Sequence, residues 1–274
     1  MPDHRYDNRF CQSETLPNAT FRQLADTLRS SNDPQSVTLG WLPQIDMCVQ
    51  LEEVDHLVSR LLTRAELDQP PFDALEIARR LRIDVIIDND QAGRARHKLL
   101  RGRSTIFVKQ DHRAERLQWS VAHELGEIFS FELKIDATET AIDSGIREQI
   151  ASEIGTRLLL PEPVFSTAAR ASRLDLSELK EQFATASYEL IARRLVTVGV
   201  PVIVSLFDKG RLVSRSSPNG KVSQRLSPLE QFNWQQAHTT SQPQQHSDES
   251  LLTRTYAIHE ANWKREFQIT TPIE

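Results

Sequence analysis

Hydrophobic residues recur at helical spacing through the middle of the chain. Apolar side chains at Val54, Leu57 and Leu61 lie on one face of a predicted helix. The same kind of spacing predicts further helices over about 73–81, 112–131, 146–160 and 187–196, and a capping box at Asp175–Glu178 predicts another. Residues 51–197 are therefore expected to form one mostly helical domain, which follows a weakly patterned N-terminal segment, residues 1–50.

Short runs of β-branched residues within this domain predict a small sheet. Residues 84–88 and 104–108 are both strongly aliphatic. They flank a basic segment, Arg94 to Arg103, which we interpret as a solvated hairpin turn, with binding to an acidic substrate or to nucleic acid as the alternative. The arrangement predicts a small antiparallel sheet.

The C-terminal segment, residues 198–274, has a different pattern. Residues 202–207 and 211–214 alternate around Asp-Lys-Gly and predict a β-hairpin. Residues 235–250 are rich in Gln, Ser, Thr and His, and are expected to form a solvated loop. The predicted fold class is α+β: a mostly helical core with a small antiparallel sheet, followed by a C-terminal segment that contains β-structure.

Composition narrows the class of protein. A length of 274 residues supports a sizeable core, and the net charge of -5 weighs against non-specific nucleic-acid binding. Two cysteines, Cys11 and Cys48, are too few for a disulfide framework. We find no signal peptide and no apolar run near the roughly 18 residues that a membrane span needs. A cytoplasmic protein without membrane association is expected.

The most informative segment is His123-Glu124-Leu-Gly-Glu127 in the helix predicted over 112–131. His123 and Glu127 are one turn apart, so a helix places both within reach of one metal ion. Glu124 stands where a general base for a metal-bound water belongs. The segment looks like a zinc-peptidase H-E-x-x-H motif whose second histidine is glutamate.

A third ligand is expected from the next predicted helix. Glu148 shares a face there with Ala151, Ser152 and Gly155, which are small enough to let a partner helix approach closely. Gly126 serves the same purpose in the first helix. Glu148 is therefore the predicted partner of His123 and Glu127.

These two helices resemble those of the ImmA/IrrE family of metallopeptidases, which typically show A-H-E-L-G-H and then E-x-x-A-N-x-F-A-x-x-L-L-M-P. The matching positions are Ala122, His123, Glu124, Gly126, Glu148, Ala151, Leu158, Leu159 and Pro161. The similarity extends over roughly residues 73–197. The departures are Glu127 for histidine, Ser152 for asparagine and Leu160 for methionine.

The resemblance implies a zincin-like peptidase core with His123, Glu127 and Glu148 as metal ligands and Glu124 as the general base. It implies hydrolysis of a peptide bond in a protein substrate, typically a helix-turn-helix repressor of stress or mobile-element genes. Zinc is the expected ion. Because two carboxylates make a harder donor set, manganese and iron are alternatives.

Several alternatives stay open. A member of this fold without catalytic activity would act as a metal-binding or interaction module, that is, as a regulator or sensor. A DNA-binding regulator is disfavoured by the acidic charge and by the lack of a recognisable helix-turn-helix. Ser187 and Arg194 suit substrate positioning or, equally, helix capping and an ion pair. His259 is not needed as a ligand, because three are already assigned.

Overall fold

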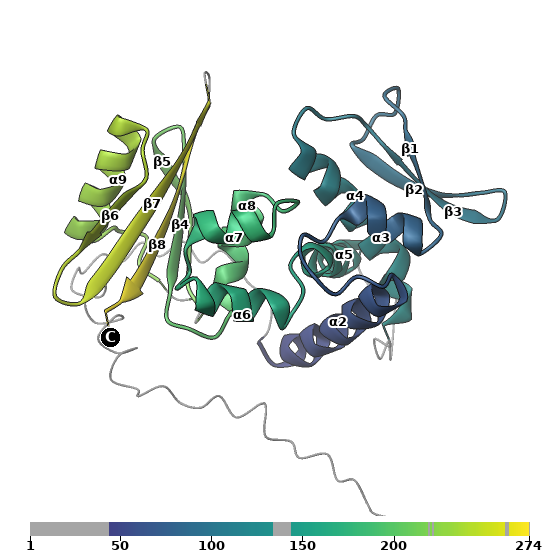
Figure 1. Ribbon diagram of the computed structural model, residues 1–274, viewed down its shortest axis with the longest axis horizontal. Coiled ribbons are helices and arrows are strands. Elements are labelled where there is room, and N and C mark those ends of the chain that lie inside the picture. The colour runs from purple at the N-terminus through teal and green to yellow at the C-terminus, as the bar shows by residue number, and fades with distance from the viewer. Residues whose placement is uncertain (1–43, 134–143, 219, 221, 261–262, 274) are drawn as a thin grey trace, which may run out of the picture. The chain divides into compact units, whose positions relative to one another are not determined.

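The structure is a computed structural model that describes residues 44–133, 144–218, 220, 222–260 and 263–273, with the backbone alone at 44–50 and 144 (Figure 1). Most of the N-terminal segment, residues 1–50, lies outside the described residues. The chain divides into two compact units, one ending at Val198 and the other beginning at Gly199. Each unit is described by itself.

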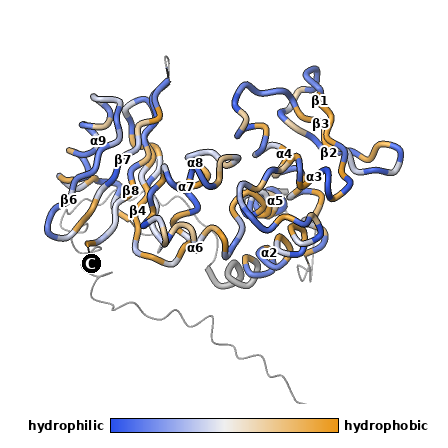
Figure 2. The backbone as a smooth tube through the Cα atoms, in the orientation of Figure 1, coloured by the Kyte–Doolittle hydropathy of each residue, from blue (hydrophilic) through white to orange (hydrophobic). Residues whose placement is uncertain are grey.

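The first unit is mostly helical, as the hydrophobic spacing predicts. Its helices are α2 (Gln44–Arg64), α3 (Ala74–Arg80), α4 (Ala114–Phe129), α5 (Ser144–Leu159), α6 (Val164–Ala171), α7 (Leu176–Gln182) and α8 (Tyr188–Arg194), with 3-10 turns at Ser130–Glu132 and Leu195–Thr197. Hydrophobic positions recur along α2, α4 and α5 (Figure 2). Fully buried side chains such as Leu57, Leu61, Leu125 and Leu158 form the core. In the described part of the chain, no helix is long and apolar enough to cross a membrane.

A buried glutamine fixes the start of α3 against α4. Asp73 caps α3 by accepting hydrogen bonds from the backbone N–H groups of Leu75 and Glu76. Gln118 of α4 donates to the Asp73 carboxylate at 2.8 Å and accepts from the Ala74 N–H at 2.6 Å. Because one side chain serves both the cap and the first turn, the orientation of α4 is set by polar contacts as well as by apolar packing.

The small sheet differs from the predicted one. Its strands are β1 (Asp84–Ile87), β2 (Ala95–Leu100) and β3 (Arg103–Val108), in the order β1-β3-β2. β2 and β3 are antiparallel, whereas β1 pairs with β3 in parallel. The interpretation of the basic segment as a solvated turn is wrong: it forms β2, and the turn is confined to Arg101 and Gly102, both at positive φ. Basic side chains remain solvated on an edge strand, so their charge is no argument against β-structure.

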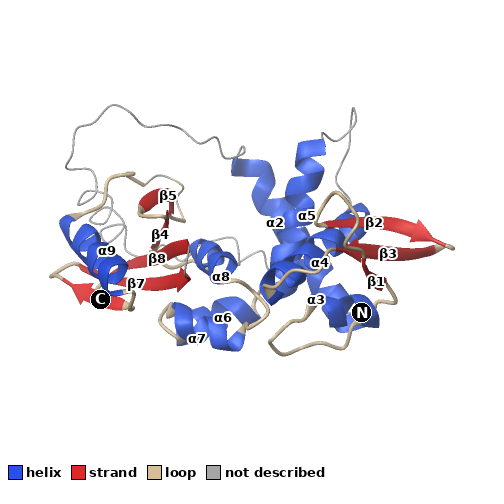
Figure 3. Cartoon of the chain, turned by 90° about the horizontal axis from the view of Figure 1, so that it is seen from above, coloured by secondary structure: helices blue, strands red, loops and turns tan. Residues whose placement is uncertain are grey.

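The second unit is a five-stranded antiparallel sheet with one helix. The strands are β4 (Ile203–Asp208), β5 (Arg211–Ser216), β6 (Gln244–Ser247), β7 (Leu251–Glu260) and β8 (Trp263–Pro272), in the order β5-β4-β8-β7-β6. The predicted hairpin is confirmed as β4–β5. The helix, α9 (Pro228–Thr240), packs beside β6, β7 and β8 (Figure 3).

The solvated loop predicted over 235–250 is wrong, because this segment contains the end of α9 and all of β6. α9 begins with a complete capping box between Ser227 and Glu230 and has proline at its first position. Few of its residues are apolar because it covers a polar face of the sheet, where Asn233 donates to the Thr253 carbonyl and Gln268 donates to the Glu230 carbonyl. A helix on such a face lacks the apolar stripe that sequence patterns detect. The predicted α+β class is confirmed.

Candidate metal centre

Helix α4 presents the motif residues beside α5. The Nε2 atom of His123 lies 3.8 Å from a carboxylate oxygen of Glu127, one turn further along α4. The same nitrogen lies 3.1 Å from a carboxylate oxygen of Glu148, which comes from the first half of α5. We call these three residues the motif cluster. The two helices thus bring together three side chains that the sequence separates by up to 25 positions.

The motif cluster is open to solvent on its carboxylate side. The His123 side chain is 17% exposed, whereas those of Glu127 and Glu148 are 45% and 62% exposed. One imidazole therefore anchors the cluster at the protein surface, and the two carboxylates lie where solvent and a substrate can reach them.

The close approach of α4 and α5 depends on two glycines, as predicted. A Cβ atom on Gly126 would lie 2.2 Å from the backbone oxygen of Ala151. A Cβ atom on Gly155 would lie 3.1 Å from the backbone of Ala122 and His123. Because helix backbones touch at these points, no larger residue fits at Gly126 without moving one helix, and the ligand positions would move with it.

Glu124 is buried next to the motif cluster, with only 5% of its surface exposed. Its Oε2 atom has no hydrogen-bond partner among the described residues, while the backbone N–H of His97 on β2 donates to the carboxylate. Burial, reinforced by the negative charges of Glu127 and Glu148, raises the pKa of Glu124 to about 7 from an ordinary value of 4.5. A carboxyl that titrates near neutrality is suited to take up and release a proton.

Two further side chains surround His123. The Ser152 hydroxyl lies 3.4 Å from Nδ1, and the Trp119 ring lies 6.1 Å from the imidazole, tilted by 42°. A hydroxyl that accepts from Nδ1–H leaves Nε2 with its lone pair toward the carboxylates. Ser152 occupies the position of the family's asparagine. In the sequence it stands out as a small neighbour of Glu148 and as a departure from the family's asparagine, but its place beside the His123 ring is seen only in the structure.

The residues present fit a divalent cation. One imidazole nitrogen and two carboxylate oxygens lie within 4.8 Å of one another, as donors around a single ion do. Next to these donors lies Glu124 Oε2, a buried acceptor that has no hydrogen-bond partner among the described residues. Such an atom is costly to bury unless a cation, a proton or a water satisfies it.

Ser187 and Arg194 have structural contacts that account for them. Ser187 caps α8 by accepting from the Leu190 N–H. Arg194 is 5% exposed, forms an ion pair with Glu162 at 3.1 Å and donates to the hydroxyl of Thr197. Capping and ion pairing, rather than substrate positioning, describe what these two side chains do here.

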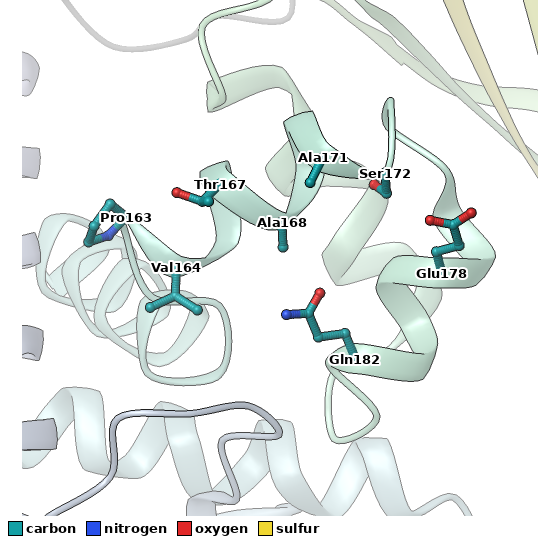
Figure 4. Close-up of a pocket in the computed structure, with 8 residues that line it drawn as sticks. All are labelled: Pro163, Val164, Thr167, Ala168, Ala171, Ser172, Glu178 and Gln182. Carbon is teal, nitrogen blue, oxygen red and sulfur yellow. The ribbon is translucent and has the colours of Figure 1, made fainter.

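A shallow pocket on the same unit lies away from this chemistry. It is formed between α6 and α7, where Ala168 and Gln182 face each other (Figure 4). Its lining includes no member of the motif cluster and not Glu124. The pocket is therefore not part of the candidate metal centre.

Fold and site together define an α+β chain in which His123, Glu127 and Glu148 meet on two closely packed helices. Residues 78–196 match the M78 peptidase family model, the IrrE N-terminal-like domain. Over residues 78–196 the chain is therefore similar to the ImmA/IrrE family, as its motifs indicated, and this family is of metallopeptidase type.

A solved structure of similar fold is a Mycobacterium tuberculosis transcriptional regulator. It aligns with a TM-score of 0.60 at 16% sequence identity, over 92% of this chain and 81% of that one. At this identity the likeness concerns the fold, which extends beyond the family domain into the second unit. No curated protein matches the chain.

Proposed function

We propose that this protein is a metal-dependent peptidase that hydrolyses a peptide bond in a protein substrate. The observation that carries the proposal is the meeting of His123, Glu127 and Glu148 next to the buried carboxyl of Glu124. Three protein ligands and a nearby carboxyl are what hydrolysis at a metal centre requires of a protein.

In this proposal His123, Glu127 and Glu148 hold one divalent cation, with zinc as the first candidate and manganese or iron as alternatives. The cation supplies Lewis acidity to a water and to the scissile carbonyl. Glu124 takes the proton from that water and returns it to the leaving amine, which its raised pKa favours. Ser152 holds the His123 ring so that Nε2 faces the carboxylates.

The substrate is proposed to be a transcriptional repressor. Two observations support a regulatory setting: the family domain at residues 78–196 and the structural likeness to a protein titled as a transcriptional regulator. β2 is an edge strand of the small sheet, and its His97 N–H donates a hydrogen bond to Glu124. An extended peptide added to this edge would reach the site by strand pairing.

The second candidate function is a non-catalytic interaction or sensing module of the same fold. Glu127 favours it, because a carboxylate replaces the imidazole that the family usually has at this position. Two carboxylates also neutralise most of the charge of a divalent ion, which weakens its effect on water.

Glu124→Gln separates the two candidates, because it keeps the shape of the side chain and removes its proton transfer. Wild-type protein and the variant are expressed in matched cells, and newly formed protein N-termini are compared by mass spectrometry. We expect N-termini that depend on wild-type protein and fall by about 10²- to 10⁴-fold in rate with the variant. Metal content of both proteins is measured in parallel, since the variant should retain its ion.

Identical N-termini in both cultures, with equal metal content, would contradict the peptidase function and favour the interaction module. A second pair of variants tests the ligand set. Glu148→Gln should lose the ion, while Gln149→Ala, an exposed neighbour on α5, should keep it.

A further inference from the structure

The second unit contains another group of residues with metal-ligand chemistry. Among the described residues, His238, His259 and Glu266 also have donor atoms within 4.8 Å of one another. They come from α9, β7 and β8, and we call them the hairpin cluster. In the sequence nothing links His259 to the other two, and the motif cluster needs no fourth ligand.

The β-hairpin register brings two of the three residues together. Glu266 of β8 pairs with Ala257 of β7, so His259, two residues further on, lies diagonally across on the same face of the sheet. α9 packs against this face through β7 and β8, and its His238 supplies the third side chain. Each donor is thus held by a different, regular element.

Glu266 is fully buried, and its contacts distinguish it from the other fully buried glutamate of this unit. Glu230 is paired with the Arg215 guanidinium through both carboxylate oxygens, at 2.8 and 2.9 Å. The ion-pair partners of Glu266 are both histidines: His238 Nδ1 at 2.8 Å and the Nε2 of His259, closer still, on the same Oε1 atom. Burying a carboxylate is costly unless hydrogen-bond donors or a positive charge stabilise it, and a bound cation is one such charge.

Both ring nitrogens of His259 have a polar partner. Its Nδ1 atom lies 2.8 Å from the Ser241 hydroxyl. In the tautomer whose Nδ1–H donates to that hydroxyl, Nε2 carries a lone pair on the side of Glu266 Oε1. In the other tautomer, Nε2–H donates to Oε1 and Nδ1 accepts from the hydroxyl. The first tautomer is the one that a metal-binding histidine adopts, with the Ser241 contact as its outer hydrogen bond. A cation would enter this site as both histidines move outward from Oε1, which they contact at hydrogen-bonding distance.

The surroundings of Glu266 are consistent with a small, enclosed site. The Trp234 indole N–H donates to Oε2 at 3.4 Å, which leaves Oε1 for the two histidines. The His238 side chain is 31% exposed, so the cluster has one side open to ions and water. The turn at Gly210 lies against the His238 ring, about 3.7 Å from where a Cβ atom would stand.

We propose that His238, His259 and Glu266 form a second divalent-cation site, which ties α9 to the β7–β8 hairpin. Two imidazole nitrogens and one carboxylate oxygen are a donor set that zinc favours. With three protein ligands and one solvent-facing side, a water completes a tetrahedral shell. The proposal does not depend on the function assigned to the motif cluster.

Zinc stoichiometry of the full chain tests the site. The background is a His123→Ala, Glu148→Ala double variant, which removes the motif cluster, so the fate of the peptidase proposal does not influence the result. After chelation, reloading with Zn²⁺ and desalting, we expect about one zinc per chain. Adding Glu266→Gln, which preserves side-chain shape, or His259→Ala should reduce this to near zero.

The matched control is His246→Ala in the same background. His246 also contacts α9, through a 2.9 Å hydrogen bond to Asn233, but it is not part of the cluster. This variant should retain one zinc, and circular dichroism should show the same fold in all variants. Co²⁺ in place of zinc should give the intense visible absorption of a tetrahedral site, which Glu266→Gln abolishes.

Two results would overturn the proposal. The first is a double variant that binds no zinc while remaining folded, in which case the hydrogen bonds from the two histidines stabilise Glu266 without an ion. The second is a zinc content that stays at one ion per chain when either Glu266→Gln or His259→Ala is added to the double variant. That result would mean that the ion binds elsewhere.

Discussion

The motif cluster and the hairpin cluster use the same two kinds of side chain but bury different ones. In the motif cluster the histidine is the less exposed member, at 17%, and the carboxylates of Glu127 and Glu148 are 45% and 62% exposed. In the hairpin cluster the carboxylate of Glu266 is fully buried and both histidines lie around it. An exposed carboxylate shell leaves room for a substrate, whereas a buried carboxylate centre suits a site that holds elements together.

The largest effect is expected from breaking the helix contact that builds the motif cluster. Gly126→Ala places a methyl group 2.2 Å from the Ala151 carbonyl oxygen, which neither backbone can avoid. We expect a loss of about 3 kcal/mol in the free energy of unfolding of the first unit, together with loss of its metal ion.

Gly155→Ala is the matched comparison, since its nearest contacts are at 3.1 Å. It should cost less than half as much, because contacts at 3.1 Å are relieved by shifts of a few tenths of an ångström, whereas a 2.2 Å clash is not. Denaturant unfolding followed by circular dichroism measures both. Equal stability of wild type and Gly126→Ala would show that the two helices are not in contact at this point.

Zinc binding at the hairpin cluster should slow hydrogen–deuterium exchange in β7 and β8, the two strands that carry His259 and Glu266. In the His123→Ala, Glu148→Ala double variant, zinc at about a hundred times its dissociation constant should stabilise β7 and β8 by about 2.7 kcal/mol. Hydrogen–deuterium exchange of peptides from these strands measures this locally. With His259→Ala, exchange in the same peptides should be independent of zinc, and protection that persists would argue that the ion binds at another place.

The buried acid of the first unit should make the metal-free protein less stable as pH rises. The pKa of Glu124 is raised to about 7 in the folded chain, so the protonated carboxyl favours folding. Its contribution is fully present below about 4.5, the pKa of the unfolded chain, and is lost as pH rises through 7. We expect the stability of wild type to fall by about 2 kcal/mol over this range relative to Glu124→Gln, which does not titrate.

Urea unfolding of both metal-free proteins between pH 4.5 and 8 measures this difference. Parallel stability curves for the two proteins would mean that Glu124 titrates at its ordinary pKa and is solvated. That result would remove the proton-transfer role assigned to it.

The smallest effect is expected from restoring the family's histidine. Glu127→His replaces a charged ligand with a neutral one and makes the donor set more like that of a zinc site. Competition with a chelator should show zinc affinity rising about tenfold, or roughly 1.4 kcal/mol. If wild type stays free of metal after reconstitution while the variant fills, then Glu127 is not a ligand.

The motif cluster could be predicted from the sequence because the information that specifies it is local. His123 and Glu127 are one helical turn apart, and the small residues around Gly126 and Gly155 indicate where the second helix approaches. Helical periodicity alone then puts Glu148 in register with them. The position of Ser152 beside Nδ1 follows from the same register, although its orienting role does not.

The hairpin cluster could not be predicted in this way. His259 and Glu266 meet only through the pairing of Ala257 with Glu266, and strand register is not visible in polar segments. α9 escapes detection because its buried face bonds to polar strand residues instead of packing on apolar ones. The basic strand β2 is missed for a related reason, since charge is as compatible with an edge strand as with a turn.

The most direct test of a metal centre on α4 and α5 is a crystal structure of the reconstituted protein with anomalous scattering measured at the zinc, manganese and iron edges. We predict an anomalous peak at the motif cluster, about 2.0–2.2 Å from His123 Nε2 and from carboxylate oxygens of Glu127 and Glu148. A well-ordered α4–α5 pair with no anomalous peak between these side chains would contradict the metal centre.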